Sequence, residues 1–86
     1  MSEDLIQRVT KVIATSKRIP LETVNIESEF AQLGIDSMDA VEILFALEGE
    51  FDITIPDDDV RSVRNVRDMC AGVERLVAAK SAPAGQ

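Results

Sequence analysis

Apolar residues recur at a helical period close to the start of the chain. They occupy positions i, i+1, i+4, i+7 and i+8, as Leu5, Ile6, Val9, Val12 and Ile13. Ser2 can cap the N-terminus of this helix, and the acidic residues that follow it suit the positive end of the helix dipole. Since Pro20 prevents continuation, the pattern predicts an amphipathic helix that ends near Lys17 and Arg18.

A second helical pattern begins after Gly34. Asp36 is a good N-cap, and we expect the helix to run to about Gly49 or Glu50. Helical spacing predicts a buried face opposite an acidic face. The buried face is expected to contain Ala40, Val41, Leu44, Leu47 and Phe51, and the acidic face Asp39, Glu42, Ala46 and Glu50. A stripe of mixed character, made of Met38, Glu42, Phe45 and Gly49, flanks them.

The segment between these two helices, residues 19–35, is longer than connections in compact domains usually are. Apolar residues are spaced through it and are expected to hold it against the core: Leu21, Val24, Ile26, Phe30 and Leu33. A short helical turn is expected at Phe30–Leu33, closed by Gly34. The pattern therefore predicts a long but anchored loop.

Two further helices are predicted in the C-terminal part. Residues 52–56 alternate like a strand, but the segment is short and we expect an extended loop. Asp57, Asp58 and Asp59 favour the start of a short third helix. Asn65 can cap a last helix, whose inward face would contain Val66, Met69, Cys70, Val73, Leu76 and Val77.

These elements predict an all-α fold. We expect a small four-helix bundle, with three longer helices, a short third helix and a long loop between the first two. A chain of 86 residues is one small domain. We expect that domain to span residues 1–80 and to be followed by a frayed tail over residues 81–86.

Composition excludes several classes of chemistry. The chain has no histidine and one cysteine, so acid–base catalysis by histidine, an internal disulfide and a zinc site built on Cys and His are all unsupported. Cys70 lies on the apolar stripe of the last helix and is expected to be a buried, inert thiol. Calcium-loop, P-loop and dinucleotide motifs are absent. We therefore expect neither an enzyme nor a metal site.

Charge is divided unevenly along the chain. The net charge is −7, yet residues 19–60 contain twelve acids and no Lys or Arg, whereas the remainder contains four acids and nine bases. Such a field repels nucleic acid and anionic membranes and attracts basic protein surfaces. An acidic surface could serve solubility alone, but the exclusion of bases from one contiguous segment favours a partner. With an acidic N-terminus and no apolar run of about 20 residues, a cytoplasmic protein is expected.

Ser37 follows the predicted cap of the second helix. Backbone N–H groups and the positive dipole end stabilise an anion attached there, by about 0.3–1 kcal/mol at an exposed site. The alternative is that Asp36 or Ser37 is only a capping residue, as most Asp-Ser pairs at helix starts are. This motif alone leaves both interpretations open.

The pattern around Ser37 extends in both directions. Its residues are Leu33-Gly34-Ile35-Asp36-Ser37-Met38-Asp39, Val41-Glu42, Ala46-Leu47-Glu48 through Phe51, and Ile55-Pro56-Asp57, followed by the closing apolar helix. They cover nearly the whole chain in register and resemble the acyl carrier protein family. The resemblance implies that a phosphopantetheinyl transferase attaches 4′-phosphopantetheine from coenzyme A to Ser37. Acyl groups would then be carried as thioesters in fatty acid, polyketide or specialised lipid biosynthesis.

The same resemblance implies docking of partner enzymes on the second helix. The partners would be acyl synthetases, transferases and synthases with basic patches, and the carrier would be a monomer. The docking residues expected are Asp36, Met38, Asp39, Glu42, Phe45, Asp57, Asp58 and Arg61. The departures from the family pattern are Gly49, Arg61, Arg64 and the bulky Phe45, and they leave a specialised carrier open beside a housekeeping one.

Two alternatives stay open. The first is an aminoacyl or peptidyl carrier, which loading by an adenylating enzyme would reveal. The second belongs to another class: an unmodified acidic interaction module that uses the same helical face. Its partner binding would be unaffected by Ser37→Ala.

Overall fold

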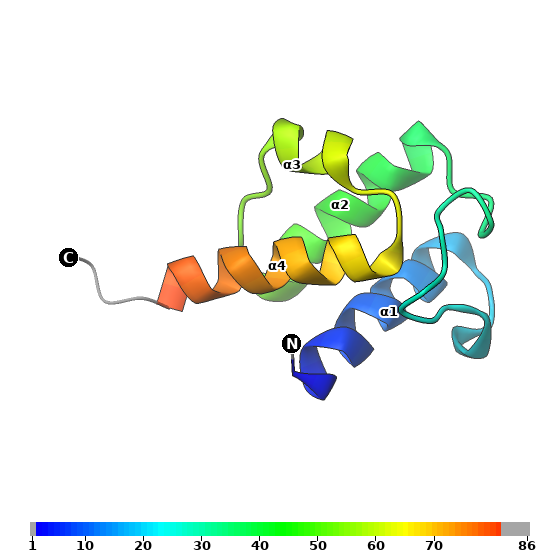
Figure 1. Ribbon diagram of the computed structural model, residues 1–86, viewed down its shortest axis with the longest axis horizontal. Helices are drawn as coiled ribbons and strands as arrows, with labels where there is room; N and C mark the ends of the chain where they lie inside the picture. Colours follow the sequence, from blue (N-terminus) through cyan, green and yellow to red (C-terminus); the bar gives the residue numbers. More distant parts are fainter. Residues whose placement is uncertain (1, 82–86) are drawn as a thin grey trace.

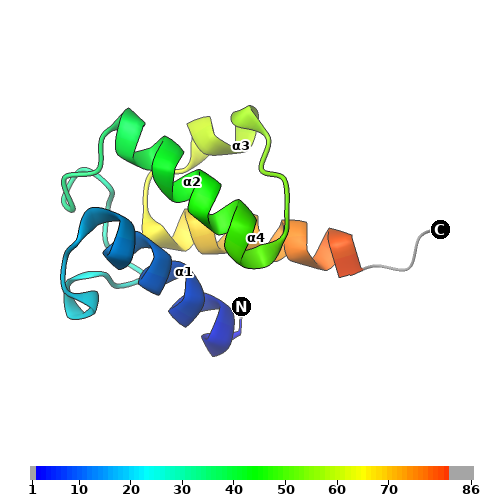
Figure 2. The same ribbon diagram turned by 180° about the vertical axis from the view of Figure 1, so that it is seen from behind.

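A computed structural model describes residues 2–81, without the side chains of residues 57, 59, 60 and 81 (Figure 1). The elements follow in the order α1 (Glu3–Lys17), the 3-10 helix η1 (Leu21–Thr23), α2 (Ser37–Phe51), α3 (Asp57–Ser62) and α4 (Val66–Ser81). Helix α1 packs against α2 and α4, and the same neighbours are visible from behind in Figure 2. The all-α class is confirmed, with three long helices and an α3 of only six residues.

Helix α1 forms as predicted. The Ser2 hydroxyl accepts a hydrogen bond from the Leu5 N–H at 3.1 Å, which satisfies one donor of the first turn. Arg18 adopts the left-handed conformation with φ 57° and ends the helix, and its N–H bonds to the carbonyls of Ala14 and Thr15. Leu5, Val9 and Ile13 of the predicted stripe are buried, with Val9 and Ile13 fully inaccessible, and Ile6 and Val12 are partly buried.

Helix α2 ends slightly later than expected, at Phe51, where Asp52 takes the left-handed conformation with φ 55°. One face assignment was wrong. Val41 was predicted to be buried, yet 45% of it is exposed, whereas Ile43 was left out of the buried set and is fully buried. The buried face is centred between Ile43 and Leu47, toward α1 and α4, and it therefore turns Val41 toward solvent. The six-residue α3 does not cover that side.

The long connection is anchored, but not by every residue expected to anchor it. Val24 and Phe30 are buried, whereas Leu21 is 48% exposed. Leu21 begins η1, which was not predicted. The turn over residues 30–34 is confirmed. Ile35 N–H bonds to the Phe30 carbonyl at 2.9 Å, and Gly34 has φ 73°, a conformation that glycine adopts without strain.

Backbone hydrogen bonds tie this connection to the start of α4. The Phe30 N–H bonds to the Arg64 carbonyl, the Val66 N–H to the Ser28 carbonyl and the Arg67 N–H to the Ile26 carbonyl, each at 3.0 Å. An isolated antiparallel bridge between Glu29 and Asn65 belongs to the same pairing. The α1–α2 connection and the start of α4, far apart in sequence, are thus joined by a contact that helical periodicity could not reveal.

The C-terminal part follows the prediction closely. Residues 52–56 form a loop, and the Asn65 side chain caps α4 by accepting the Asp68 N–H at 2.7 Å. Val66, Met69, Cys70 and Val73 are buried, and Leu76 and Val77 are partly buried. Ser81, expected to begin the tail, is the last residue of α4, and residues 82–86 of the predicted tail lie outside the described part. Among the described residues, no helix is long and apolar enough to cross a membrane.

Candidate functional site

Ser37 is the first residue of α2 and is exposed. The turn at Gly34 precedes it, and a reciprocal capping box fixes its flanks. The Asp39 N–H donates to Asp36 Oδ1 at 2.8 Å, and the Asp36 N–H donates to Asp39 Oδ2 at 3.3 Å. Within the described part of the chain, the Ser37 hydroxyl and the N–H groups of Ser37 and Met38 form no hydrogen bond. This arrangement presents an available hydroxyl beside two donors that suit an anion.

An ion pair connects the start of α2 to the end of α1. Lys17 Nζ lies 2.8 Å from Asp39 Oδ2, and both side chains are partly exposed. The hydrogen bond to Asp39 raises the pKa of Lys17, and the hydrogen bond from Lys17 is the main reason why the pKa of Asp39 is lowered. Asp39, expected to serve docking, is therefore engaged within the molecule, and its docking role stays a prediction.

Lys17→Met is expected to raise the pKa of Asp39 toward its ordinary value, measured by a carbon-13 NMR titration of the carboxyl group. Because the pKa of Asp39 is lowered in the folded state, its stabilising contribution is present at neutral pH and lost in acid. The difference in free energy of unfolding between wild type and Lys17→Met should therefore shrink as the pH falls below about 4. Lys11→Met, on the same helix, should leave the Asp39 titration unchanged. An equal effect of both variants would contradict the stabilising role of the Lys17–Asp39 ion pair.

Other acids of α2 are also used internally. Glu50 Oε2 accepts from Arg8 Nε at 2.9 Å, and the Arg8 guanidinium carbon lies 4.3 Å from the centre of the Phe51 ring. Glu48 Oε2 accepts the Ile55 N–H at 2.8 Å, which fixes the loop that follows α2. Glu42 is exposed and forms no ion pair with a described side chain. The acidic face of α2 is thus less available to partners than its composition indicates.

An apolar stripe runs along the exposed side of α2 instead. It consists of Met38, Val41 and Phe45, which are 75%, 45% and 66% exposed. Their spacing of three and four residues places them on one line of the helix surface. Folding gives such large apolar side chains no reason to face water together, so the apolar stripe indicates a contact surface.

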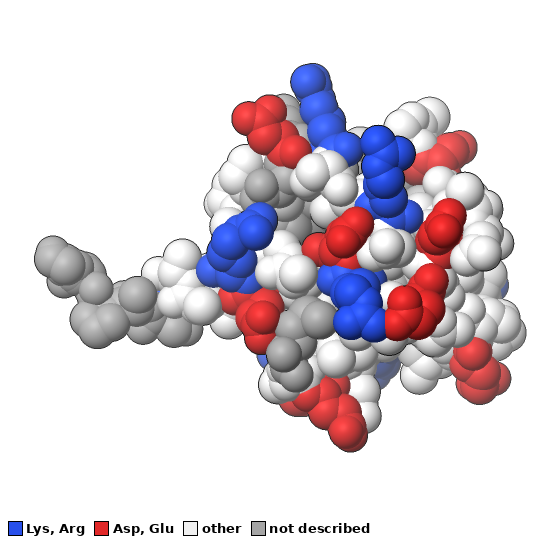
Figure 3. All heavy atoms as spheres, in the orientation of Figure 1, with Lys and Arg blue, Asp and Glu red and all other residues white. Residues whose placement is uncertain are grey.

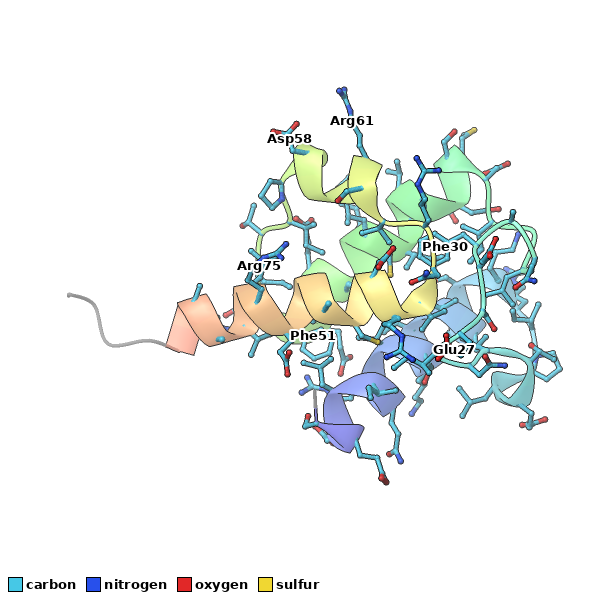
Figure 4. All side chains as sticks on the ribbon, viewed as in Figure 1. Glu27, Phe30, Phe51, Asp58, Arg61 and Arg75 are labelled. Atoms are coloured by element: carbon cyan, nitrogen blue, oxygen red, sulfur yellow. The ribbon has the colours of Figure 1, made fainter. Side chains whose placement is uncertain are left out.

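The remaining predicted docking residues lie on α3. Asp58 and Arg61 are exposed, and in Figure 4 both side chains point away from the helices into solvent. Arg64 follows α3 and is exposed as well. Asp57 is the first residue of α3, and its side chain lies outside the described part.

An apolar cavity lies in the interior between α2 and α4. It measures about 20 Å³ and is lined by Leu44, Ile55, Val63, Met69, Gly72, Val73 and Leu76. A volume of that size holds about one water molecule. The residues around it are aliphatic and belong to four different segments, so small shifts of side chains can enlarge it.

Comparison with known proteins places these features in a family. The family described as "Phosphopantetheine attachment site" matches residues 5–73. The chain is 35% identical over 68 residues to the "Acyl carrier protein" of Rickettsia bellii, covering 78% of this chain and 79% of that protein. It is 35% identical over 81 residues to "Acyl carrier protein 1, chloroplastic" of Hordeum vulgare, covering 93% of this chain but 54% of that protein, so it spans about half of the barley sequence.

A solved structure agrees. The crystal structure of the acyl carrier protein of Thermotoga maritima superimposes with a TM-score of 0.81 at 28% identity, covering 92% of this chain and 93% of that one. The matches extend from α1 into α4 and therefore include the whole arrangement that presents Ser37. The chain belongs to the acyl carrier protein family.

Proposed function

We propose that Ser37 is the attachment residue for 4′-phosphopantetheine and that the chain carries acyl groups in fatty acid, polyketide or specialised lipid biosynthesis. The observation that carries the proposal is the exposed Ser37 hydroxyl at the capped start of α2, inside the matched range 5–73. A phosphodiester there would lie beside the N–H groups of Ser37 and Met38. The attached group supplies a terminal thiol that holds the acyl chain as a thioester.

The protein itself contributes position and recognition, as befits a carrier rather than a catalyst. Asp36 and Asp39 hold the first turn of α2, and Gly34 lets the chain enter it. Among the residues that the structure describes, no group of three or more His, Cys, Asp or Glu side chains could hold a metal ion. Family members interact with a phosphopantetheinyl transferase and with acyl-handling enzymes.

Cys70 does not compete with the thiol of the arm. It is fully buried, and burial, assisted by the charge of Glu74, raises the pKa of its thiol to about 11. Fewer than about one in a thousand Cys70 thiols is then ionised at pH 7.5, and the thiolate is the reactive form.

The number of thiols that react quickly with a reagent such as DTNB should therefore report whether the arm is attached. Native protein without the arm is expected to show no fast-reacting thiol, and native protein with the arm should show one. Denaturation should add one thiol to each form. A fast-reacting Cys70 in the native protein without the arm would contradict both its burial and its raised pKa.

The apolar cavity is proposed to receive the start of the acyl chain. At about 20 Å³ it is too small for more than a water molecule, so entry requires side chains such as Leu44 and Ile55 to move apart. Leu76 and Gly72 close the α4 side of the same space. A binding-induced enlargement is compatible with the aliphatic lining, whose side chains can change rotamers without breaking hydrogen bonds.

Finer features of the protein are part of the same proposal. We propose a cytoplasmic monomer, organised as one acyl-carrier domain over residues 1–80, in which the short α3 is the fourth member of a four-helix bundle. Partner enzymes would dock on α2 and α3 through the predicted residues Asp36, Met38, Asp39, Glu42, Phe45, Asp57, Asp58 and Arg61. Exposure of Met38, Glu42, Phe45 and Arg61 supports this assignment.

Intact mass spectrometry of protein purified from its native host tests the proposal directly. One phosphopantetheine arm per chain is expected, with a further mass increment that identifies the acyl cargo. An aminoacyl increment would favour the peptidyl-carrier alternative, and a permanently unmodified chain would contradict the proposal.

A further inference from the structure

Several basic residues of this protein are held in ion pairs, whereas others are exposed and form none with a described side chain. Arg8, Lys17, Arg67 and Lys80 each form an ion pair with an acidic side chain of another helix or of a loop. Arg61 and Arg64, in contrast, are exposed and form no ion pair with any described side chain. Ion pairs with described side chains therefore do not explain the presence of these two arginines, which follow the acidic stretch of residues 19–60 in the sequence.

Helix geometry places the apolar stripe next to the side of α2 that faces α3. Successive residues of a helix turn by about 100°, so one flank of α2 carries Asp39 and Glu50 and the other carries Leu44 and Glu48. The first flank faces α1, because Asp39 pairs with Lys17 and Glu50 with Arg8.

The second flank faces the α3 side, because Leu44 shares the apolar cavity with Ile55 and Val63 and Glu48 bonds to Ile55. Val41 and Phe45 of the apolar stripe lie between that flank and the exposed crest of α2, where Glu42 lies. Helix α3 lies next to α2 on this side (Figures 1 and 2), with Arg61 on the helix and Arg64 just after it.

The resulting surface has three parts. Glu42 supplies negative charge on one side, the apolar stripe lies in the middle, and Arg61 and Arg64 supply positive charge on the α3 side. Figure 3 shows the face formed by α3 and α4, where basic side chains lie among acidic ones rather than beside a uniform acidic area. A partner with an entirely basic docking patch would be repelled by the α3 side of this surface.

We infer that the preferred partner is an acyl-handling enzyme whose apolar pocket has a basic rim facing Glu42 and an acidic rim facing Arg61 and Arg64. This inference rests on the proposed carrier function and adds the chemistry of the partner to it. Phe45 enters the pocket as the anchor, because a rigid aromatic side chain gives large contact area at low entropic cost. Arg61 and Arg64 select the enzyme by charge and reject surfaces of the opposite design.

Charge reversal at both arginines tests the inference in two arms. The wild type and all variants are first loaded with 4′-phosphopantetheine and checked by intact mass. A wild type that fails at that step contradicts the attachment proposal, separately from the docking surface. The first arm uses a bacterial malonyl-CoA transferase whose docking patch is basic. Arg61→Glu/Arg64→Glu is expected to lower its KM for the carrier about threefold to tenfold, with kcat unchanged.

The second arm uses an enzyme of the source organism, chosen only because it acylates the wild-type carrier. Here the same double variant should raise KM about threefold to tenfold, and added salt should shrink the effect. Lys11→Glu on α1 is the control, with an expected effect below about twofold. It changes the net charge by two units, as Arg64→Glu alone does, whereas the double variant changes it by four. If the two introduced glutamates unfold α3, which far-UV circular dichroism would show, Arg64→Glu alone replaces the double variant.

A double variant that behaves like Lys11→Glu in both arms would overturn the inference, and so would a lower KM in the second arm. Opposite signs in the two arms support it. Phe45→Ala should raise KM about tenfold in both arms, since the anchor serves either kind of partner. An unchanged KM for Phe45→Ala would contradict the anchor role.

Discussion

Ser37→Ala is expected to abolish attachment of the arm when the protein is incubated with coenzyme A and a phosphopantetheinyl transferase. The reason is chemical, because alanine has no hydroxyl to form the phosphodiester. Intact mass spectrometry should show wild type gaining one arm and the variant gaining none. No partial attachment is expected in the variant, since no other hydroxyl occupies the first turn of α2.

Loss of folding would not explain that result. Ser37 is exposed, and the helix is capped by Asp36, not by the Ser37 side chain. The free energy of unfolding should therefore change by no more than about 0.5 kcal/mol. Ser16→Ala, a serine on α1, is the control and should be loaded like wild type. Arm addition to Ser37→Ala would contradict the assignment, as would an unmodified wild type under conditions in which a reference carrier is loaded.

The same variant separates the carrier from the unmodified interaction module. A carrier that cannot be loaded cannot deliver an acyl group, however well its α2 surface binds. Transfer of acyl groups should therefore disappear in Ser37→Ala while docking through the apolar stripe persists. Partner function unaffected by the substitution would favour the module.

Sequence periodicity predicted the helices well because each depends on local information. Ser2, Asp36 and Asn65 cap the helices that follow them, and Gly34 closes the turn before α2, so these boundaries follow from single side chains. The all-α class and the exposed Ser37 follow from the same signals.

Contacts between distant segments were not available from those patterns. Val41 and Ile43 are both apolar, and only the packing of α1 and α4 decides that Ile43 is buried and Val41 is not. The backbone pairing between residues 26–30 and 64–67 has no sequence period at all. In both cases the deciding partner lies elsewhere in the chain.

The availability of the acidic side chains on α2 also depends on partners elsewhere in the chain, and it bears on function. The sequence predicted a docking face on α2 in which Asp36, Asp39 and Glu42 supply charge beside the apolar Met38 and Phe45. The structure instead pairs Asp39 with Lys17 and Glu50 with Arg8, so part of that charge stabilises the packing of α1 on α2. The feature left unexplained by folding is apolar, and it is the surface around Phe45.

Leu47→Ala is expected to lower the free energy of unfolding by about 2–5 kcal/mol, because it opens a cavity where a fully buried side chain contacts the core. A domain of this size has a total stability of about 4–13 kcal/mol, so the variant would be close to unfolding. Urea denaturation followed by circular dichroism measures the change, with the m-value unchanged if only stability is affected.

Phe45→Ala, two residues earlier on the same helix, is the matched comparison. Phe45 is 66% exposed, and its removal should change stability by no more than about 0.5 kcal/mol, since alanine is also the better helix former. The larger of the two side chains thus contributes least to folding, which leaves recognition as the reason for its exposure. Equal destabilisation by the two variants would mean that Phe45 packs against the fold. That result would contradict the role of the apolar stripe as a docking surface.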